Sequence, residues 1–142
     1  MLDMTSEEIR SFLMDAVRTG KLATVRADGR PHVVPIWYVL DGDDLVFNTW
    51  HTSVKAKNMR RDPRVAISVD DEQPPFSFVM VEGVVELQEL SPEELLPWAT
   101  KIGARYMGEA LGEQFGKRNG VEGELLVRLK PTKIIAKKNV SD

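Results

Sequence analysis

Short apolar runs separated by turn signals constrain the fold of this chain more than any other feature. Asp28-Gly29 is a strong two-residue hairpin signal between strands expected at 22–25 and 31–40. Pro35 inside the second run removes a ladder donor, which predicts an edge, a bulge or an irregular stretch. Five further strands are expected at residues 45–49, 65–69, 76–90, 125–129 and 134–136.

Three helices are expected around these strands, in addition to a short one described below: residues 5–20, 91–108 and 111–115. Thr5 and Glu8 stand at capping-box spacing before an apolar stripe. Ser91 and Glu94 repeat that spacing, with Pro92 at the first helical position. Six or seven short strands, mostly joined by hairpins, predict a closed antiparallel barrel with peripheral helices, an all-β dominated (β+α) fold.

The composition limits the classes of protein that this chain can belong to. Its 142 residues suit a single domain spanning 1–142. The net charge of -3 gives no general attraction to nucleic acid or to an acidic membrane. No cysteine is present, and neither a signal peptide nor a membrane-spanning segment is recognisable, so a cytoplasmic location is expected. His32 and His51 lack ligand-like spacing, so no metal site is expected.

The segment 47–64 reads as a strand, a tight polar corner and a short helix. Thr52 or Ser53 is expected to cap that helix. Its first turn holds Lys55, with Lys57 just behind it, and no carboxylate. This runs against the usual preference, because a helix N-terminus favours negative charge. Free N–H groups, hydroxyls and ammonium groups at one place indicate a phosphate site, against the alternative of a solvated cationic helix.

Several segments together resemble a known family. The most informative are Asp28-Gly-Arg-Pro-His-Val-Val-Pro-Ile-Trp-Tyr38 and Ser53-Val-Lys-Ala-Lys-Asn-Met-Arg-Arg-Asp-Pro-Arg-Val65. Further matching segments are 20–26, 45–49, 81–84 and 123–134. The ordered set resembles the FMN-binding split-barrel superfamily related to pyridoxamine 5'-phosphate oxidase, and within it the coenzyme F420-dependent oxidoreductase branch. The resemblance implies an antiparallel split barrel that forms a homodimer and binds a flavin or deazaflavin ring at the subunit interface.

The resemblance also implies roles for individual residues. The phosphate of the coenzyme would be held by Lys55 and Lys57, with Ser53 and Asn58 assisting. The ring would be lined by Val34, Pro35, Ile36 and Trp37. The floor near the ribityl chain would be formed by Phe47, Asn48 and Thr49. The neighbouring subunit would contribute Phe78 and Met80. No catalytic acid is assigned by this comparison.

The function implied is hydride transfer from reduced F420 to a small conjugated or unsaturated substrate. Two alternatives stay open: an FMN-dependent oxidoreductase, and a non-catalytic flavin, F420 or haem-binding protein. Five basic residues between Lys55 and Arg64 exceed what one phosphate needs, which favours F420 with its polyglutamate tail. Nucleic-acid binding is disfavoured, because aromatic residues are not interleaved with the basic run.

Overall fold

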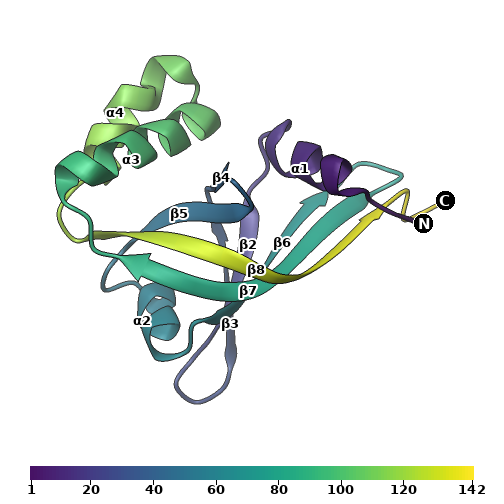
Figure 1. Cartoon of the computed structure of the whole chain (residues 1–142), viewed down its shortest axis with the longest axis horizontal. Coiled ribbons are helices and arrows are strands. Elements are labelled where there is room, and N and C mark those ends of the chain that lie inside the picture. The colour runs from purple at the N-terminus through teal and green to yellow at the C-terminus, as the bar shows by residue number, and fades with distance from the viewer.

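The computed structural model describes residues 1–142, whose strands form one antiparallel sheet of eight strands (Figure 1). The strands are β1 (Leu2–Asp3), β2 (Gly20–Val25), β3 (Pro31–Ile36), β4 (Val39–Asp41), β5 (Asp44–Trp50), β6 (Arg64–Asp71), β7 (Ser77–Gln88) and β8 (Glu124–Lys138). They follow the order β3-β2-β6-β7-β8-β5-β4, and β1 pairs with β8. The expected β-dominated antiparallel fold is confirmed.

The sheet is not closed by hydrogen bonds, so the expectation of a fully closed barrel is wrong. β3 and β4 are the two ends of the hydrogen-bonded path, and Trp37 and Tyr38 join them covalently. The Tyr38 amide donates to the Tyr106 hydroxyl (3.2 Å), and the Tyr38 carbonyl accepts from Arg105. Because helix side chains hold both backbone groups of Tyr38, the predicted strand 31–40 is divided in two.

The last strand is longer than predicted. The runs 125–129 and 134–136 belong to one strand, β8, and Pro131 stays in register opposite Gly83. A register shift between Glu82 and Gly83 in β7 accommodates the bend. A Cβ atom at Gly83 would lie 2.4 Å from the Lys130 carbonyl oxygen, so the close approach of the two strands requires glycine there.

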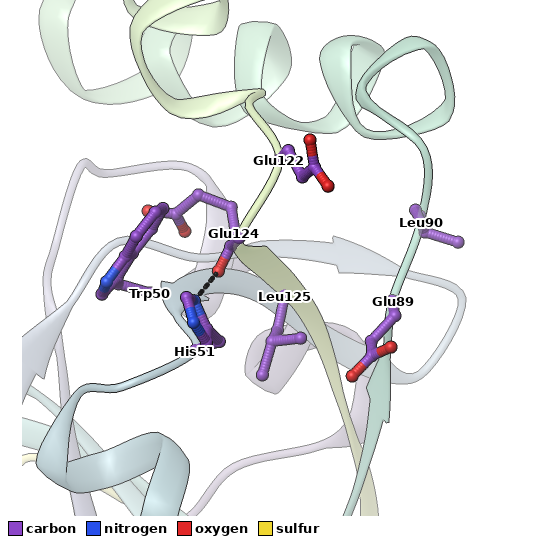
Figure 2. A pocket seen from close by; sticks show the side chains of 8 residues that line it. Trp50, His51, Glu89, Leu90, Glu122, Glu124 and Leu125 are labelled. Carbon is purple, nitrogen blue, oxygen red and sulfur yellow. Dashed lines mark hydrogen bonds between the residues drawn. The ribbon is translucent and has the colours of Figure 1, made fainter.

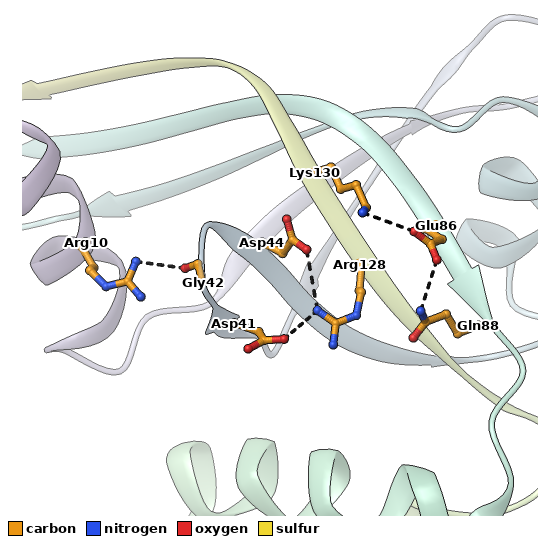
Figure 3. A network of polar contacts seen from close by, with 8 residues as sticks. All are labelled: Arg10, Asp41, Gly42, Asp44, Glu86, Gln88, Arg128 and Lys130. Atoms are coloured by element: carbon orange, nitrogen blue, oxygen red, sulfur yellow. Dashed lines mark hydrogen bonds and ion pairs between the residues drawn. The ribbon is translucent and has the colours of Figure 1, made fainter.

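Ion pairs fix β8 to its neighbours (Figure 3), and the Arg128 guanidinium also lies over the Trp98 ring. Arg128 lies 2.8 Å from Asp41 and 3.6 Å from Asp44, at the two ends of the β4–β5 turn. Lys130 pairs with Glu86 of β7 at 3.5 Å. These contacts tie the β4–β5 hairpin to the central strand, in addition to the backbone ladder between β5 and β8.

The core lies between the curved faces of the sheet. Its fully buried side chains come from almost every strand: Leu22, Tyr38, Phe47, Ile67, Val69, Val79, Val81, Val127 and Leu129. A smaller cluster packs the helical pair described below against β4, β5 and β8: Val39, Val46, Leu95, Ile102 and Leu126. This second cluster places helical residues beside the ends of β5 and β8.

Helix α1 (Ser6–Met14) begins with the predicted capping box of Thr5 and Glu8. It ends at Met14, earlier than the expected stop near Gly20. The carbonyls that would continue the helix accept from arginine side chains instead. Arg18 donates to the Phe12 carbonyl, and Arg105 donates to those of Leu13 and Ala16. Side-chain donors therefore replace the backbone donors of a further helical turn.

Helices α3 (Pro92–Met107) and α4 (Glu109–Asn119) form an antiparallel pair at one end of the sheet (Figure 1). The cap at Ser91 is confirmed, whereas α4 is twice as long as the piece predicted at 111–115. Glycine has a low helical propensity, so the glycines of α4 prevented its full length from being predicted from the sequence. A Cβ at Gly116 would lie 2.0 Å from the Thr100 hydroxyl, so glycine lets the two helices touch.

Helix α2 (Val54–Arg61) follows β5 directly, as predicted. Ser53 is its N-cap and accepts from the Ala56 amide (3.2 Å), which decides between the two hydroxyls expected there. Asp62 ends the helix before Pro63. No helix in the structure is long and apolar enough to cross a membrane.

Candidate functional site

A cavity of about 490 Å³ lies where the end of β3, the end of β5, the start of α2 and the start of β8 meet the α3–α4 pair. Its lining residues are Thr19, Pro35, Ile36, Trp37, Asn48, Thr49, Trp50, Lys55, Ile102, Asn119 and Glu124. Its size falls in the range of small-molecule and cofactor sites. The lining combines apolar and aromatic side chains with amide, hydroxyl and charged groups.

The start of α2 supplies unused hydrogen-bond donors at this cavity. The amides of Val54 and Lys55, the first two helical residues, donate no hydrogen bond within the chain. The Ser53 hydroxyl is hydrogen-bonded to Thr49 (3.0 Å) and caps the Ala56 amide. No acidic residue lies in the first turn. The positive end of the helix is therefore left without a negative partner from the chain itself.

Lys55 is a half-buried ammonium group that forms no ion pair within 4 Å, whereas most other basic side chains near the sheet are paired. Burial lowers the pKa of Lys55, and the charge of Glu124 partly offsets that effect. A cation that is partly desolvated without a contacting anion is costly for the chain alone. An anionic ligand in the cavity would remove that cost.

Six of the predicted site residues line this one cavity: Pro35, Ile36, Trp37, Asn48, Thr49 and Lys55. They come from positions as far apart as β3 and α2, and the fold brings them together. Pro35 stays in the β2–β3 ladder opposite Lys21, and its ring leaves the strand without a donor at that point. The predicted irregularity falls just beyond it, at Trp37.

Other predicted residues lie beside the cavity rather than in its lining. Ser53 is the N-cap of α2, and Lys57 is exposed on the same helix. Asn58 is buried, where its amide donates to the Thr24 hydroxyl (3.0 Å) and its carbonyl accepts from Arg61 (3.2 Å). Phe47 is fully buried in the core below the neighbouring lining residues. None of these four side chains is part of the cavity lining.

The remaining predicted residues lie on the sheet away from the cavity lining. Val34 pairs with Leu22 within the β2–β3 ladder and is half-buried. Phe78 and Met80 are half-buried on β7, opposite Lys137 and Ile135 of β8. Within one copy of the chain, these three side chains do not border the cavity.

Glu124 is the only carboxylate in the lining and was not anticipated. It begins β8 opposite Trp50 of β5, and its Oε2 accepts from the Asn48 amide (3.1 Å). Burial raises the pKa of Glu124, with Asn48 and Lys55 acting in the other direction. The sequence gives no local signal for this placement, because the β5–β8 pairing joins segments about 75 residues apart.

Glu124 and Trp50 also border a second, adjoining pocket of about 530 Å³ (Figure 2). Trp50 packs against His51, with ring centroids 4.8 Å apart, and His51 Nδ1 is 2.9 Å from the Gly123 carbonyl oxygen. Gly123 has φ +96°, and a Cβ there would lie 2.5 Å from the Trp50 ring. Glycine at 123 therefore allows Trp50 to lie against the start of β8, where it borders both pockets.

The aromatic wall of the cavity is held from behind by α3. Trp37 stacks on Tyr106 with ring centroids 5.1 Å apart and an interplanar angle of 2°. The Tyr106 hydroxyl donates to the Arg18 carbonyl (2.7 Å) while accepting from the Tyr38 amide. Trp37 therefore has a fixed ring orientation without its own polar contact, as the wall of a preformed site requires.

The three arginines of the basic run already have partners. Arg60 pairs with Glu89 (3.3 Å), Arg64 pairs with Asp62 (2.8 Å), and Arg61 donates to the Asn58 amide oxygen and the Val25 carbonyl. The hydrogen bonds from Arg64 lower the pKa of Asp62 to about 2. The number of basic residues between Lys55 and Arg64 therefore does not by itself favour a polyanionic ligand.

The donor set fits the phosphate end of a flat coenzyme. The fit rests on the unpaired Lys55 ammonium, the free amides of Val54 and Lys55, and the apolar groups of Pro35 and Trp37 in the same lining. Asn48 and Thr49 add polar groups that can pair with the hydroxyl groups of a linking chain. A single cavity thus offers suitable groups for each part of such a molecule.

Comparison with known proteins gives the family. The chain matches the family described as pyridoxamine 5'-phosphate oxidase over residues 5–138, and it belongs to that family. A conserved hypothetical protein from Mycobacterium tuberculosis has a similar structure, with 30% identity and a TM-score of 0.79 over 97% of this chain and 87% of that protein.

Two further solved structures are similar. An F420 reductase shares 29% identity, with a TM-score of 0.68 over 87% of this chain and 94% of the reductase. The haem storage protein HutZ from Vibrio cholerae shares 21% identity, with a TM-score of 0.74 over 96% of this chain and 98% of HutZ, which is a likeness of fold alone. The family resemblance inferred from the sequence is thus confirmed.

Proposed function

We propose that this chain is an oxidoreductase that binds coenzyme F420 in the cavity beside α2 and transfers hydride to a small conjugated or unsaturated substrate. The observation that carries this proposal is the half-buried Lys55 ammonium without an ion pair, beside two free helix amides. That arrangement favours a phosphate. The 29% identity with an F420 reductase supports the deazaflavin over other phosphate-bearing coenzymes.

In the proposed reaction, the chain binds the coenzyme and orients it. Lys55 and the start of α2 would hold the phosphate, and Lys57 would add positive potential from the exposed side of the helix. Asn48 and Thr49 would contact the linking polyol, and Pro35, Ile36 and Trp37 would lie against the ring. When bound, the reduced coenzyme supplies a hydride to the substrate, and excluding water from the ring is left to the protein.

A homodimer would complete this site. Phe78 and Met80 lie outside the cavity lining of their own chain. In a dimer they would reach the ring from the neighbouring copy, as the family resemblance implies. A sedimentation measurement of the molecular mass tests this part separately, because a monomer at concentrations that bind coenzyme would exclude the shared site.

FMN is the alternative coenzyme, because it carries a similar ring and one phosphate. Parallel titrations of F420 and FMN, followed by fluorescence, test the choice directly. We expect F420 to bind more tightly and Lys55→Met to weaken both. Lys133→Met is a matched control, because Lys133 is exposed on β8 and does not line the cavity.

Two outcomes would overturn the proposal: no binding of either coenzyme, or binding that Lys55→Met leaves unchanged. Tighter binding of FMN would replace F420 by FMN at the same site. Catalysis is tested by mixing reduced F420 and the protein with enones, quinones and biliverdin. Binding of coenzyme without oxidation across that panel would favour a carrier.

A further inference from the structure

A carboxylate lines the cavity in which a phosphate is proposed to bind. Glu124 is the only acidic residue of that lining, and Lys55 is its only basic residue. Both are half-buried, and they lie in the same cavity without forming an ion pair within 4 Å. The Asn48 amide holds the carboxylate at 3.1 Å, so its position is fixed by β5 rather than by Lys55.

The charges of the cavity balance only when it holds no anion. Glu124 supplies one negative charge and Lys55 one positive charge, and water in the cavity screens them less than bulk solvent would. A phosphate that contacts Lys55 brings a second negative charge into this space. Unless Glu124 becomes neutral, it repels the entering group across the cavity.

We propose that Glu124 is the counter-ion of Lys55 before the coenzyme binds, and that it takes up a proton when the coenzyme's phosphate replaces it. This inference rests on the proposed function. It makes Glu124 a residue that regulates coenzyme affinity through pH. Protonated Glu124 stays hydrogen-bonded to Asn48, because its second oxygen remains an acceptor.

Other charged groups face Glu124 from the neighbouring elements. Lys55 lies on α2, and His51 lies in the turn that follows β5. Glu122 and Glu89 border the adjoining pocket with Glu124 (Figure 2), and Glu89 is paired with Arg60. Lys55 and His51 favour the charged form of Glu124, whereas burial favours its neutral form. His51→Gln is therefore the control for a pH dependence that does not come from Glu124.

The direction of the effect follows from the pKa of Glu124, which burial raises above its usual value. As the pH falls through that pKa, Glu124 loses its charge and the affinity for the phosphate rises. Lys55 acts at the opposite end of the pH range, because losing its own charge at alkaline pH also weakens binding. The two residues thus give separate limbs in a plot of affinity against pH.

The test is a fluorescence titration with F420 between about pH 5 and about pH 8, using the wild-type chain, Glu124→Gln and His51→Gln. The phosphate of F420 is a diester whose charge does not change with pH, whereas the phosphate of FMN titrates at about pH 6 itself. We expect wild-type affinity to fall roughly tenfold as Glu124 gains its charge. Glu124→Gln should remove this fall, and His51→Gln should retain it.

A calorimetric measurement on the unmodified chain is independent of any variant. Titrating F420 in two buffers of different ionisation enthalpy, at a pH where Glu124 is charged, should show net proton uptake on binding. Binding without proton uptake would overturn the inference. A Glu124→Gln chain that binds F420 with wild-type affinity and pH dependence would do the same and leave the proposed function intact. A pH dependence that disappears only in His51→Gln would also overturn it.

If no variant binds F420 or FMN at any pH, both this inference and the proposed function are wrong. If Glu124→Gln binds more weakly than the wild type at every pH, the carboxylate contributes to binding directly and the counter-ion role is excluded. These results differ from one another, so the test separates failure of the site from failure of its regulation.

Discussion

Two half-buried cations, Arg105 and Lys55, differ in what surrounds them. Arg105 donates to the carbonyl oxygens of Tyr38, Leu13 and Ala16, and its guanidinium lies 4.7 Å from the Tyr38 ring centroid. Lys55 has no such partners. Arg105 therefore belongs to the fold, whereas Lys55 is available to a ligand. A buried charge indicates a functional site where the chain itself supplies no partner for it.

The largest effect is expected from Arg105→Ala. The variant removes the Arg105 donor from three carbonyl groups, of which that of Leu13 keeps the Tyr38 hydroxyl as a partner, and it weakens the attachment of α3 to the end of α1 and to the β3–β4 junction. We expect the free energy of unfolding to fall by about 3 kcal/mol, measured by urea denaturation. Arg105→Lys keeps the charge but not the planar fork, so a loss between zero and that value is expected. An unchanged stability in Arg105→Ala would contradict the structural role.

Lys55→Met is expected to weaken coenzyme binding without lowering stability, the opposite of Arg105→Ala. The variant keeps an unbranched apolar side chain, so we expect the dissociation constant of F420 to rise roughly 10- to 100-fold, or about 1.4–2.8 kcal/mol. The free energy of unfolding should stay the same or increase, because burial disfavours the charged form of Lys55 and lowers its pKa. A marked loss of stability in Lys55→Met would show that this lysine serves the fold after all.

Alkaline pH is expected to lower the stability of the fold around Tyr38, whose carbonyl accepts from Arg105. Burial raises the pKa of Tyr38 to about 12, so the folded chain keeps a proton that the unfolded chain loses near pH 10. The unfolded state then binds fewer protons, and the free energy of unfolding falls by about 1.4 kcal/mol per pH unit between those values. Denaturation curves at successive pH values measure the slope. Tyr38→Phe should flatten it, and an equal slope in that variant would assign the effect to other groups.

The smallest effect is expected from Lys57→Ala. Lys57 is exposed and does not line the cavity, so its charge acts on the coenzyme through solvent. We expect a few-fold weaker affinity for F420 that disappears at high salt, measured by the same fluorescence titration. A loss as large as that of Lys55→Met would mean that Lys57 contacts the phosphate directly.

Local signals in the sequence predicted the elements that carry their own start and stop residues. The boxes at Thr5 and Ser91 were predicted, and the cap of α2 was narrowed to Thr52 or Ser53, because these contacts lie within four residues. Helix α4 was largely missed, since its glycines pack against α3 and no local pattern reports that packing. Local chemistry thus predicts boundaries better than contacts between elements.

The candidate site was predictable in part for the same reason. Lys55 and the start of α2 form a local pattern, whereas Glu124 reaches the cavity only through the pairing of β8 with β5. The division of the strand at Trp37 depends on Tyr106 and Arg105 from α3, about 68 residues further along the chain. Neither segment contains a local sequence pattern that indicates long-range pairing of this kind.

The order of strands has a consequence for how the chain matures. In the hydrogen-bonded ladder, β8 is the sole partner that joins the β4–β5 hairpin to β7 and the rest of the sheet. Until β8 has paired with β5 and β7, the two sides of the cavity are held together by few contacts, among them the hydrogen bond from Asn58 of α2 to Thr24 of β2. A ligand that contacts both sides would stabilise this junction, and chains without it would be cleaved more readily by a protease.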